Sequence, residues 1–531
     1  MRKRRLFFNG KIYTQVAGLP PAESMAIDGN LIAAVGKNLK YDADFSSYEK
    51  IDLHGSAVIP GLIDAHTHFY FIIISMGTVK LDGLNSLEHV LDRIRKHSAK
   101  LEKDEWVVGE GFSPDRWKKF VVPDRLMLDK VTGGRPAAIF SKDQHMLWTN
   151  SKALALAGIS SGTPQPAGGA IERLADGSPS GILKEIPGYF PVFKLIGKPG
   201  RSKIARFHQM TLKEAYSRGV TGVHSFDGPD ALPYFRDLSA EKKLGLRVNF
   251  YPPAKMIEEL ARQGIGRNYG NDYFRVTGVK IFADGSLGSQ SALCFQKYIG
   301  SKNNFGIETT PKSEIAELIE KAFKLNLPAA IHAIGDKAIS NVLDCFEHAP
   351  ALPHRIRHRI EHLQMIRRSD IARVKRLGVV ASMQPTHCPS DIRLIEKYWG
   401  KRGRNCYIFR TLIDRGVNLA FGSDAPIETL HPVAGIDAAV NRFIPGTRKS
   451  FYPQERISVA EAIFNFTAGP AYAVGQENEL GYLLPGYKAD FVVFEENPYK
   501  ISRFELSGLQ PAATFLDGAP VHLQGKLARL L

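Results

Sequence analysis

The sequence has little that would support a disulfide framework or a membrane span. Its four cysteines are scattered through 531 residues, and no two form a Cys-X-X-Cys pair, so they fit a reducing compartment better than structural disulfides. The longest apolar run, Phe69 to Met76, is far shorter than the ~20 residues that cross a bilayer. The basic start is followed only by Leu6 to Phe8 before Asn9-Gly10, well below the roughly 7–15 apolar residues of a signal peptide. We therefore expect a cytoplasmic protein with no membrane partner.

Acidic residues are in the minority, with 54 Asp and Glu against 70 Lys and Arg and a net charge of +16. Such a charge permits binding of nucleic acid or anionic lipid. The basic residues are dispersed, however, in short clusters such as Arg367-Arg368 and Lys401-Arg402, and the sequence contains no RNA- or DNA-binding motif. We expect a basic solvated surface and no nucleic-acid partner. Nucleic-acid binding is the alternative from another functional class, and it predicts binding that weakens steeply with salt.

Short strands and turns occupy both ends of the chain. Asn9-Gly10 and Asp28-Gly29 stand between apolar runs, which is a hairpin signal. Near the other end, Ala489–Phe494 is strand-like, and a last pair of short strands is expected near Ala513–Leu516 and Val521–Leu523. Half a sheet at each end predicts one β-sandwich domain made from residues 1–58 and 473–531, with the chain termini close together.

The middle of the chain alternates apolar strands with helical patterns, which is typical of βα units. About eight such units fit an α/β fold with a (β/α)8 barrel, here over residues 59–472. Residues at about 105–200 break this rhythm with Gly- and Pro-rich pieces, and we expect an insertion there that packs over the barrel mouth. The expected helices are Lys312–Leu325, Lys337–Glu347, Asp370–Leu377 and Val459–Phe466. The expected strands are Val58–Asp64, Gly219–His224, Arg247–Tyr251, Val276–Phe282, Ala329–His332, Arg357–His362, Val379–Gln384 and Val417–Ser423.

Residues suited to binding a metal stand at the carboxyl ends of these strands, where barrel enzymes build their sites. His66 and His68 follow the first strand. Because residues i and i+2 of a strand point to the same face, both imidazoles can reach one cation. His332 and His362 close two later strands, and Asp424 follows the last one. Imidazole and carboxylate donors favour Zn²⁺ or another borderline divalent ion, so the set predicts a divalent-metal centre.

Asp424 and Lys280 each have two interpretations. A bound cation lowers the pKa of its water toward ~7 and polarises a carbonyl. Asp424 could pass the proton of that water to a leaving nitrogen or act only as a metal ligand, and we expect it to do both. Burial beside metals would depress the pKa of Lys280, and its neutral amine could then capture carbon dioxide as an anionic carbamate that bridges two metals. A lysine paired with a carboxylate beside one metal explains the residue equally well.

Further candidates surround this set. His145 lies in the expected insertion and His387 follows the next-to-last strand. Either could hydrogen-bond a substrate oxygen and stabilise a tetrahedral intermediate, or make structural hydrogen bonds. Asp336 and Glu361 adjoin candidate ligands and could orient them. We expect the apolar run Phe69–Met76 to form the buried face of a helix, with the lining of a substrate pocket as the alternative.

Seven motifs are spread over nearly the whole chain: Pro60–His68, Asp143–Leu154, Lys280–Ser289, Ile331–Asp336, Arg359–His362, Gly422–Pro426 and Leu484–Asp490. Each motif alone would be weak, but together they are specific. They resemble the amidohydrolase superfamily, and more closely the amidohydrolase family 3 branch that includes N-substituted formamide deformylase and uncharacterised metal-dependent hydrolases.

The resemblance implies a urease-like β domain around a (β/α)8 barrel, and hydrolysis of a C–N bond, usually an amide, in a small molecule. Opening of a cyclic amide or deamination on the same scaffold stays an alternative, because a fold does not fix the substrate. The oligomeric state is open, with a homodimer as one expectation. The implied centre holds two metals per chain, one on His66, His68 and Asp424 and the other on His332 and His362, with carboxylated Lys280 as the bridge.

Overall fold

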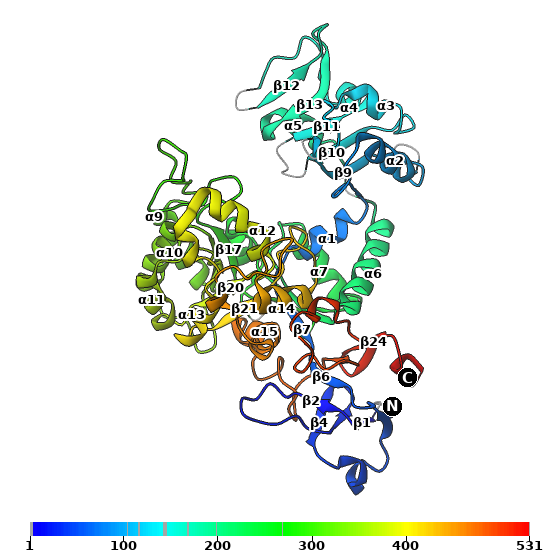
Figure 1. Ribbon diagram of the computed structural model, residues 1–531, viewed down its shortest axis with the longest axis vertical. Helices are drawn as coiled ribbons and strands as arrows, with labels where there is room; N and C mark the ends of the chain where they lie inside the picture. The colour runs from blue at the N-terminus through cyan, green and yellow to red at the C-terminus, as the bar shows by residue number, and fades with distance from the viewer. Residues whose placement is uncertain are drawn as a thin grey trace. The chain divides into compact units, whose positions relative to one another are not determined.

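The computed structural model (Figure 1) describes residues 4–529 except 103–104, 115–116, 142–145, 167–168, 198 and 268. The chain forms two compact units, one from residues 1–72 and 209–531 and the other from residues 73–208. It passes between them within helices α1 (Phe69–Ser75) and α6 (Arg201–Ser217). Within the described residues, every helix is too short or too polar to span a lipid bilayer.

Two parallel sheets form the centre of the first unit, which makes the chain a mixed α/β protein. Their strands are almost wholly buried, as expected of parallel strands covered on both faces. Two backbone hydrogen bonds also connect these sheets, from Lys280 N to Pro252 O at 2.9 Å and from Asp424 N to His66 O at 2.7 Å. One sheet has the order β16 (Phe274–Val276), β15 (Arg247–Phe250), β14 (Val220–Ser225), β7 (Leu62–Thr67). The other has the order β17 (Val279–Phe282), β18 (Ala329–Ala333), β19 (Arg359–His362), β20 (Val380–Met383), β21 (Leu419–Phe421).

Two strands that the sequence predicts as continuous are each two strands in the structure. The expected strand Val58–Asp64 is interrupted at Gly61, between β6 (Ala57–Pro60) and β7, which belong to different sheets. The expected strand Val276–Phe282 is interrupted at Gly278, between β16 and β17. A Cβ on Gly278 would lie 2.6 Å from Pro328 O, so only glycine fits where the chain passes this carbonyl. Val279 N donates to Pro328 O at 2.9 Å, whereas β16 pairs with β15. The chain therefore changes its pairing partner at this glycine.

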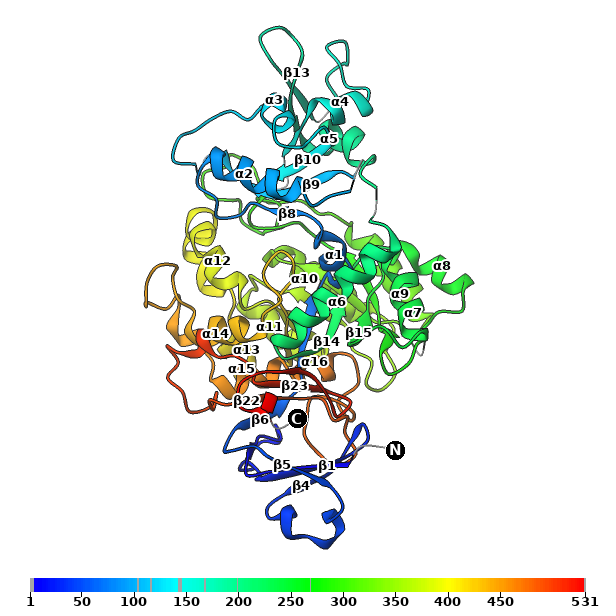
Figure 2. The ribbon, with the colours of Figure 1, turned by 90° about the vertical axis from the view of Figure 1, so that its right-hand side faces the viewer.

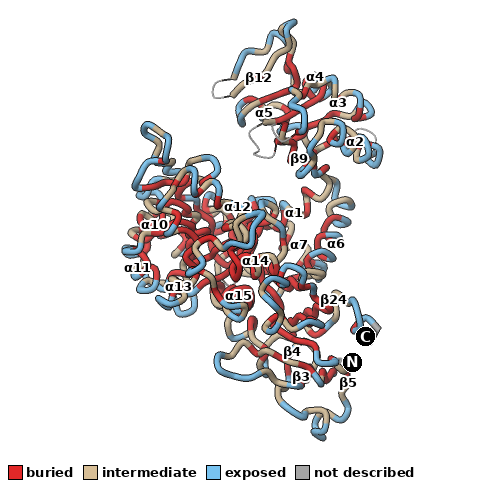
Figure 3. Tube along the Cα trace, in the orientation of Figure 1, coloured by how far each residue is buried: buried red, intermediate tan, exposed pale blue. Residues whose placement is uncertain are grey.

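Helices follow most of these strands, and the four that the sequence predicts match α9, α10, α11 and α15 within two residues at each end. Ile339, Val342 and Phe346 of α10 are buried, with the three- and four-residue spacing of an amphipathic helix. In Figure 3 the buried trace runs through the interior, while α10, α11 and α13 carry exposed stretches. The helices of the first unit after α6 are α7 (Ala231–Ala240), α8 (Ile257–Arg262), α9 (Lys312–Phe323), α10 (Asp336–His348), α11 (Ile371–Arg376), α12 (His387–Leu394), α13 (Phe409–Asp414), α14 (Pro432–Asn441), α15 (Val459–Asn465) and α16 (Ala468–Ala473).

Strands from both ends of the chain form two further sheets in the same unit. Strand β6 pairs antiparallel with β22, so early and late segments lie side by side (Figure 2). The rings of Phe7, Phe491 and Phe515 pack together in the core between these sheets, with centroids 4.3 to 5.3 Å apart. One sheet has the order β4 (Leu31–Gly36), β3 (Ser24–Asp28), β1 (Arg4–Phe8), β5 (Glu49–Asp52). The other has the order β2 (Lys11–Ile12), β6 (Ala57–Pro60), β22 (Phe491–Phe494), β23 (Ala513–Leu516), β24 (Ala519–Leu523).

The second unit has its own six-stranded sheet and hydrophobic core, which contains Val90, Ile94 and Trp148. The insertion predicted at about 105–200 falls within this unit, which begins earlier because β8 pairs with β9. Its packing over a barrel mouth stays a prediction. The strand order is β12 (Ala170–Arg173), β13 (Pro179–Lys184), β11 (Met146–Thr149), β10 (Ala137–Ser141), β9 (Val107–Phe112), β8 (Val79–Lys80), and the helices are α2 (Leu87–Ser98), α3 (Arg125–Asp129), α4 (Ser151–Leu156) and α5 (Glu185–Phe193).

Candidate metal centre

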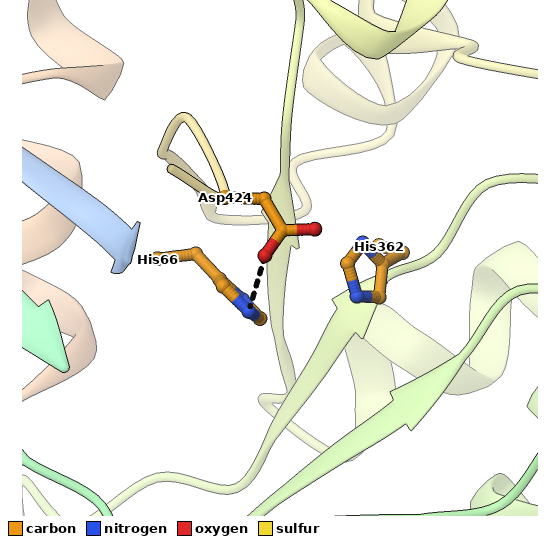
Figure 4. A group of neighbouring side chains, drawn as sticks. All are labelled: His66, His362 and Asp424. Atoms are coloured by element: carbon orange, nitrogen blue, oxygen red, sulfur yellow. Dashed lines mark ion pairs between the residues drawn. The ribbon is translucent and has the colours of Figure 1, made fainter. Parts of the chain in front are cut away.

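Three of the predicted ligands come together at the carboxyl ends of parallel strands. His66 lies near the end of β7, His362 ends β19, and Asp424 follows β21. One ligand atom from each residue lies within 4.8 Å of the other two. Figure 4 shows the two imidazoles on either side of the Asp424 carboxylate, with His66 Nε2 3.5 Å from Asp424 Oδ1. Segments distant in the sequence thus present two imidazoles and one carboxylate to the same space.

His68 shares the same carboxylate oxygen. Its Nε2 lies 3.2 Å from Asp424 Oδ1, and its backbone N donates to Ala425 O at 2.8 Å. The alternation of a strand therefore brings His66 and His68 to one oxygen, as their spacing predicts. The side chain of His68 is 28% exposed whereas that of His66 is 1% exposed, so His68 lies on the solvent side of the group.

Two of these residues have unusual backbone conformations. Asp424 has a φ of 61° and His362 a φ of 70°, in the left-handed region that residues other than glycine seldom occupy. Burial alone would raise the pKa of Asp424, but the neighbouring His66 and His68 hold it well below its usual range. Asp424 is therefore an ionised carboxylate, and its backbone conformation aims it at the imidazoles.

A buried carboxylate orients the ring of His66 through its Nδ1 atom. His66 Nδ1 donates to Glu361 Oε2 at 2.6 Å, and Arg359 Nε donates to Glu361 Oε1 at 2.5 Å. Burial and then the charge of Lys280 lower the pKa of His66 to about 4. The imidazole is therefore neutral near pH 7, with its proton on Nδ1 and the lone pair of Nε2 toward Asp424. A carboxylate behind a histidine is the usual way in which proteins fix the tautomer of a metal ligand.

Lys280 is buried beside this group. Its Nζ lies 4.7 Å from the centroid of the Phe226 ring and 5.0 Å from that of Phe282, and it has no hydrogen-bond partner in the described part of the chain. Burial lowers the pKa of Lys280 to about 8. Because a buried amine without a partner is costly, these surroundings fit a lysine that gains partners when a metal centre is assembled.

His332 and His362 lie next to each other, with ring centroids 4.5 Å apart. His332 Nε2 is 3.0 Å from Gly285 O and 3.6 Å from Asp284 Oδ1. Burial lowers the pKa of His332 to about 3, and His362 Nδ1 is buried with no partner among the described residues. The geometry groups His362 with His66 and Asp424, so its assignment to a second cation with His332 stays a prediction.

The other predicted site residues have different outcomes. His387 begins α12, and its Nε2 lies 3.8 Å from Asp424 Oδ2. His145 lies outside the described residues. Asp336 accepts a hydrogen bond from Phe295 N at 3.0 Å, and it is Asp284 rather than Asp336 whose carboxylate lies close to His332. The structure therefore places His387, but not Asp336, beside the candidate ligands.

Several supporting residues were not predicted. Arg359 is completely buried and also donates to Ala65 O at 2.7 Å, while its Nη1 lies 2.8 Å from His224 Nδ1. Phe226 stacks on the His66 ring with centroids 4.3 Å apart. The sequence did contain a signal for Arg359. Arg359 and Glu361 are two residues apart in one strand, so their side chains point to the same face. Two charged residues on one face of a buried strand indicate an internal ion pair.

The residues present fit a divalent cation. The imidazoles of His66, His332 and His362 stay neutral because burial lowers their pKa values, so their ring nitrogens can donate electron pairs. Asp424 is ionised and buried within reach of two of these rings. A set of neutral imidazoles with a carboxylate is the donor chemistry of zinc and similar ions.

Comparisons with known proteins agree with this chemistry. Residues 49–522 match the profile of the amidohydrolase family. Protein LONG AFTER FAR-RED 3 of Arabidopsis thaliana is 32% identical over 97% of this chain and 91% of its own, and N-substituted formamide deformylase of Arthrobacter pascens is 26% identical over 97% of each. The crystal structure of an uncharacterized metal-dependent hydrolase from Pyrococcus furiosus superposes with a TM-score of 0.79 at 29% identity, covering 94% of this chain and 100% of that one. The chain belongs to the amidohydrolase family, which confirms the resemblance in its sequence motifs.

Proposed function

We propose that the protein is a metal-dependent amidohydrolase that cleaves an amide-type C–N bond of a small molecule. Membership of the amidohydrolase family and the likeness to a metal-dependent hydrolase support a hydrolase that uses a divalent metal. The observation that carries the proposal is the convergence of His66, His362 and Asp424, with their ligand atoms within 4.8 Å of one another. N-substituted formamide deformylase, whose name specifies an amide-type substrate, is a relative over nearly the full length.

The proposed centre has two divalent cations, with zinc as the expected ion. His66, His68 and Asp424 would hold one cation, His332 and His362 would hold the other, and a carboxylated Lys280 would supply a ligand to both. When bound, such cations lower the pKa of a water molecule and polarise a substrate carbonyl. The pKa of about 8 for Lys280 supports the carbamate, because about a tenth of the amine is then neutral at pH 7, far more than for an ordinary lysine with a pKa of about 10.4.

Asp424 and His387 are the proposed catalytic residues described in the structure. Asp424, held as a carboxylate, accepts a proton from the attacking water and returns it to the leaving nitrogen. The hydroxyl of the water is added to the carbonyl carbon as the C–N bond breaks. We expect His387, whose Nε2 lies 3.8 Å from the same carboxylate, to donate a hydrogen bond to the substrate oxygen. We expect the same role for His145.

The proposed scaffold is a (β/α)8 barrel over residues 59–472, flanked by a composite β-sandwich from residues 1–58 and 473–531. The backbone hydrogen bonds from Lys280 N to Pro252 O and from Asp424 N to His66 O support the barrel. The second connects the ends of the edge strands β21 and β7, and the first connects β17 to the segment after β15; closure of one barrel requires such contacts between the sheets. Residues at the carboxyl ends of its strands would then share one mouth, where barrel enzymes bind their substrates.

Metal analysis combined with a substrate panel tests the function. We expect the purified protein to contain a divalent metal and to hydrolyse at least one amide among formamides, N-acyl amino acids, hydantoins and aminopurines. His66→Ala should lose both the metal and the activity, whereas the control His89→Ala, on an exposed face of α2, should keep both. Full hydrolysis by His66→Ala would refute the assignment. Activity confined to hydantoins or aminopurines would favour a cyclic amidase or a deaminase instead.

A further inference from the structure

A cavity lies in the first unit, away from the candidate metal centre. Its volume is about 420 Å³, within the range of about 300–1,000 Å³ for small-molecule pockets. Part of its wall is the segment that leads into β19, and β19 begins at Arg359 and ends at the candidate ligand His362. The cavity therefore adjoins the opposite end of this strand from the metal centre. Its lining is polar and largely cationic, and includes Asn249, Arg267, Asn271, Arg275, His354 and Arg355.

Two of the arginines that line the cavity have no carboxylate partner among the described residues. Arg267 donates to two backbone carbonyls, those of Thr277 and Val474. Arg355 is exposed. With the amide of Asn478 oriented so that its oxygen faces Arg355, this oxygen accepts hydrogen bonds from both Nη atoms of Arg355 at 2.7 Å. Burial, followed by the charges of Arg275 and Arg357, lowers the pKa of Arg267. Positive charge is thus concentrated here without full compensation.

The acidic residue of the lining does not supply that compensation. One oxygen of Asp272 pairs with Lys488, and the other lies 3.4 Å from Arg275 Nη2. Arg275 also pairs with Glu479 at 3.2 Å. The charges of Asp272 and Arg275 are therefore balanced locally, whereas Arg267 and Arg355 form no ion pair with a carboxylate among the described residues. Glu477 offsets part of the charge near Arg267 but pairs with Arg357.

Gly475 lies between the backbone of Arg355 and the side chain of Arg267. Gly475 has a φ of 74°, and a Cβ on it would lie 2.6 Å from Arg355 O and 2.9 Å from Arg267 Nη2. Only glycine therefore fits between the Arg355 backbone and the Arg267 guanidinium. The close approach joins segments that are nearly 90 and more than 100 residues apart in the sequence.

We propose that this cavity binds a phosphate dianion, either free or as the phosphate group of a small organic molecule, through Arg267 and Arg355. Two guanidinium groups without an ion pair among the described residues match the charge of the dianion, and their planar N–H groups suit the geometry of its oxygens. The polar lining excludes a largely apolar ligand. This site goes beyond the proposed hydrolase function, because it requires neither the metal nor the amide substrate.

Calorimetric titration of the full chain at constant ionic strength tests the site. The probes are inorganic phosphate, glycerol 3-phosphate and ribose 5-phosphate, with glycerol and chloride as blanks. We expect saturable binding of one phosphate-bearing probe per chain. Tighter binding of an ester than of inorganic phosphate would identify an organic phosphate as the ligand, and the reverse order would identify the free ion.

Charge-removing variants separate this site from the general basicity of the protein. Arg355→Gln should weaken binding by roughly 10-fold or more, because one charge-assisted contact is lost. Arg415→Gln removes an equal charge at an exposed position outside the cavity and should bind like the parent. Thermal unfolding of both variants shows whether they are folded. The absence of saturable binding, or equal binding by folded Arg355→Gln and Arg415→Gln, would overturn the proposal.

Discussion

His66 Nδ1 and Glu361 Oε2 lie 2.6 Å apart, with the two side chains 1% and 0% exposed. Glu361 is held in turn by Arg359, which is completely buried and donates to both of its carboxylate oxygens. Burial alone would raise the pKa of Glu361, but Arg359 and His66 hold it well below its usual range. The row Arg359–Glu361–His66 therefore fixes the tautomer and the direction of one candidate metal ligand.

Replacement of Glu361 should weaken metal binding without removing a ligand. In Glu361→Gln the acceptor of the His66 proton loses its charge, and we expect the metal affinity to fall by about 10- to 100-fold. Competition with a chelator of known affinity measures the change. The control Glu347→Gln alters a surface carboxylate that pairs with Arg373 and Arg376, and its affinity should be unchanged. Equal affinities in the two folded variants would contradict the role assigned to Glu361.

Asp424→Asn should abolish most of the hydrolysis. The amide cannot take up the proton of the attacking water, so we expect kcat to fall by roughly 10²- to 10⁴-fold. Steady-state kinetics with the best amide of the substrate panel measure the loss, and metal analysis of the same sample separates it from loss of the ions. Asp414→Asn, at an exposed position at the end of α13, is the matched control. A kcat within about twofold of the parent would exclude Asp424 as the proton carrier.

Lys280 should carry a carbamate in the metal-loaded protein. We expect a carbamate carbon signal in the NMR spectrum of protein loaded with metal in ¹³C-bicarbonate, because burial lowers the pKa of Lys280 to about 8 and leaves its amine reactive. Lys280→Arg cannot form this group and should lose the signal and part of the bound metal. A parent protein with full metal content and no carbamate signal would favour an ordinary lysine beside the metals.

The ion pair between Arg247 and Asp490 should contribute to global stability. Arg247 of β15 donates to both oxygens of Asp490, at 2.6 and 3.0 Å, and both side chains are buried. Asp490→Asn leaves the buried guanidinium with Asp517 as its remaining carboxylate partner, and we expect a loss of about 1–3 kcal/mol in the free energy of unfolding. Urea unfolding measures it. In the exposed pair of Arg236 and Asp237, Asp237→Asn should cost less than about 1 kcal/mol. Similar losses in the two variants would be inconsistent with this role.

Protonation of the buried His358 should lower the free energy of unfolding at acidic pH. Its ring stacks on Phe346, its Nδ1 accepts from Ala329 N at 3.0 Å, and burial lowers its pKa to about 4. In the unfolded chain the pKa of a histidine is about 6.5. Between pH ~6.5 and 4 the unfolded chain therefore binds more protons at this residue than the folded protein does. The contribution of His358 to stability is complete above this range and is lost as the pH falls through it. His358→Gln should flatten the fall in urea-unfolding free energy over this range. Parallel curves for parent and variant would contradict the assignment.

The sequence alone determined the local structure and the choice of candidate ligands. Apolar runs and helical spacing predict β18, β19 and α10 within two residues, because strand and helix periodicity is set by neighbours along the chain. The spacing of His66 and His68 likewise predicts that both imidazoles reach one centre, and in the structure they meet at one oxygen of Asp424.

Only the tertiary structure decided which distant groups meet. The break at Gly278 depends on the carbonyl of Pro328, the orientation of His66 depends on Glu361 nearly 300 residues later, and the cationic cavity depends on segments that Gly475 allows to touch. Such contacts join residues far apart in the chain, and they cannot be predicted from local periodicity, which depends only on neighbours along the sequence. Burial in the folded protein, absent from the extended chain, then lowers the pKa values of His66 and Lys280.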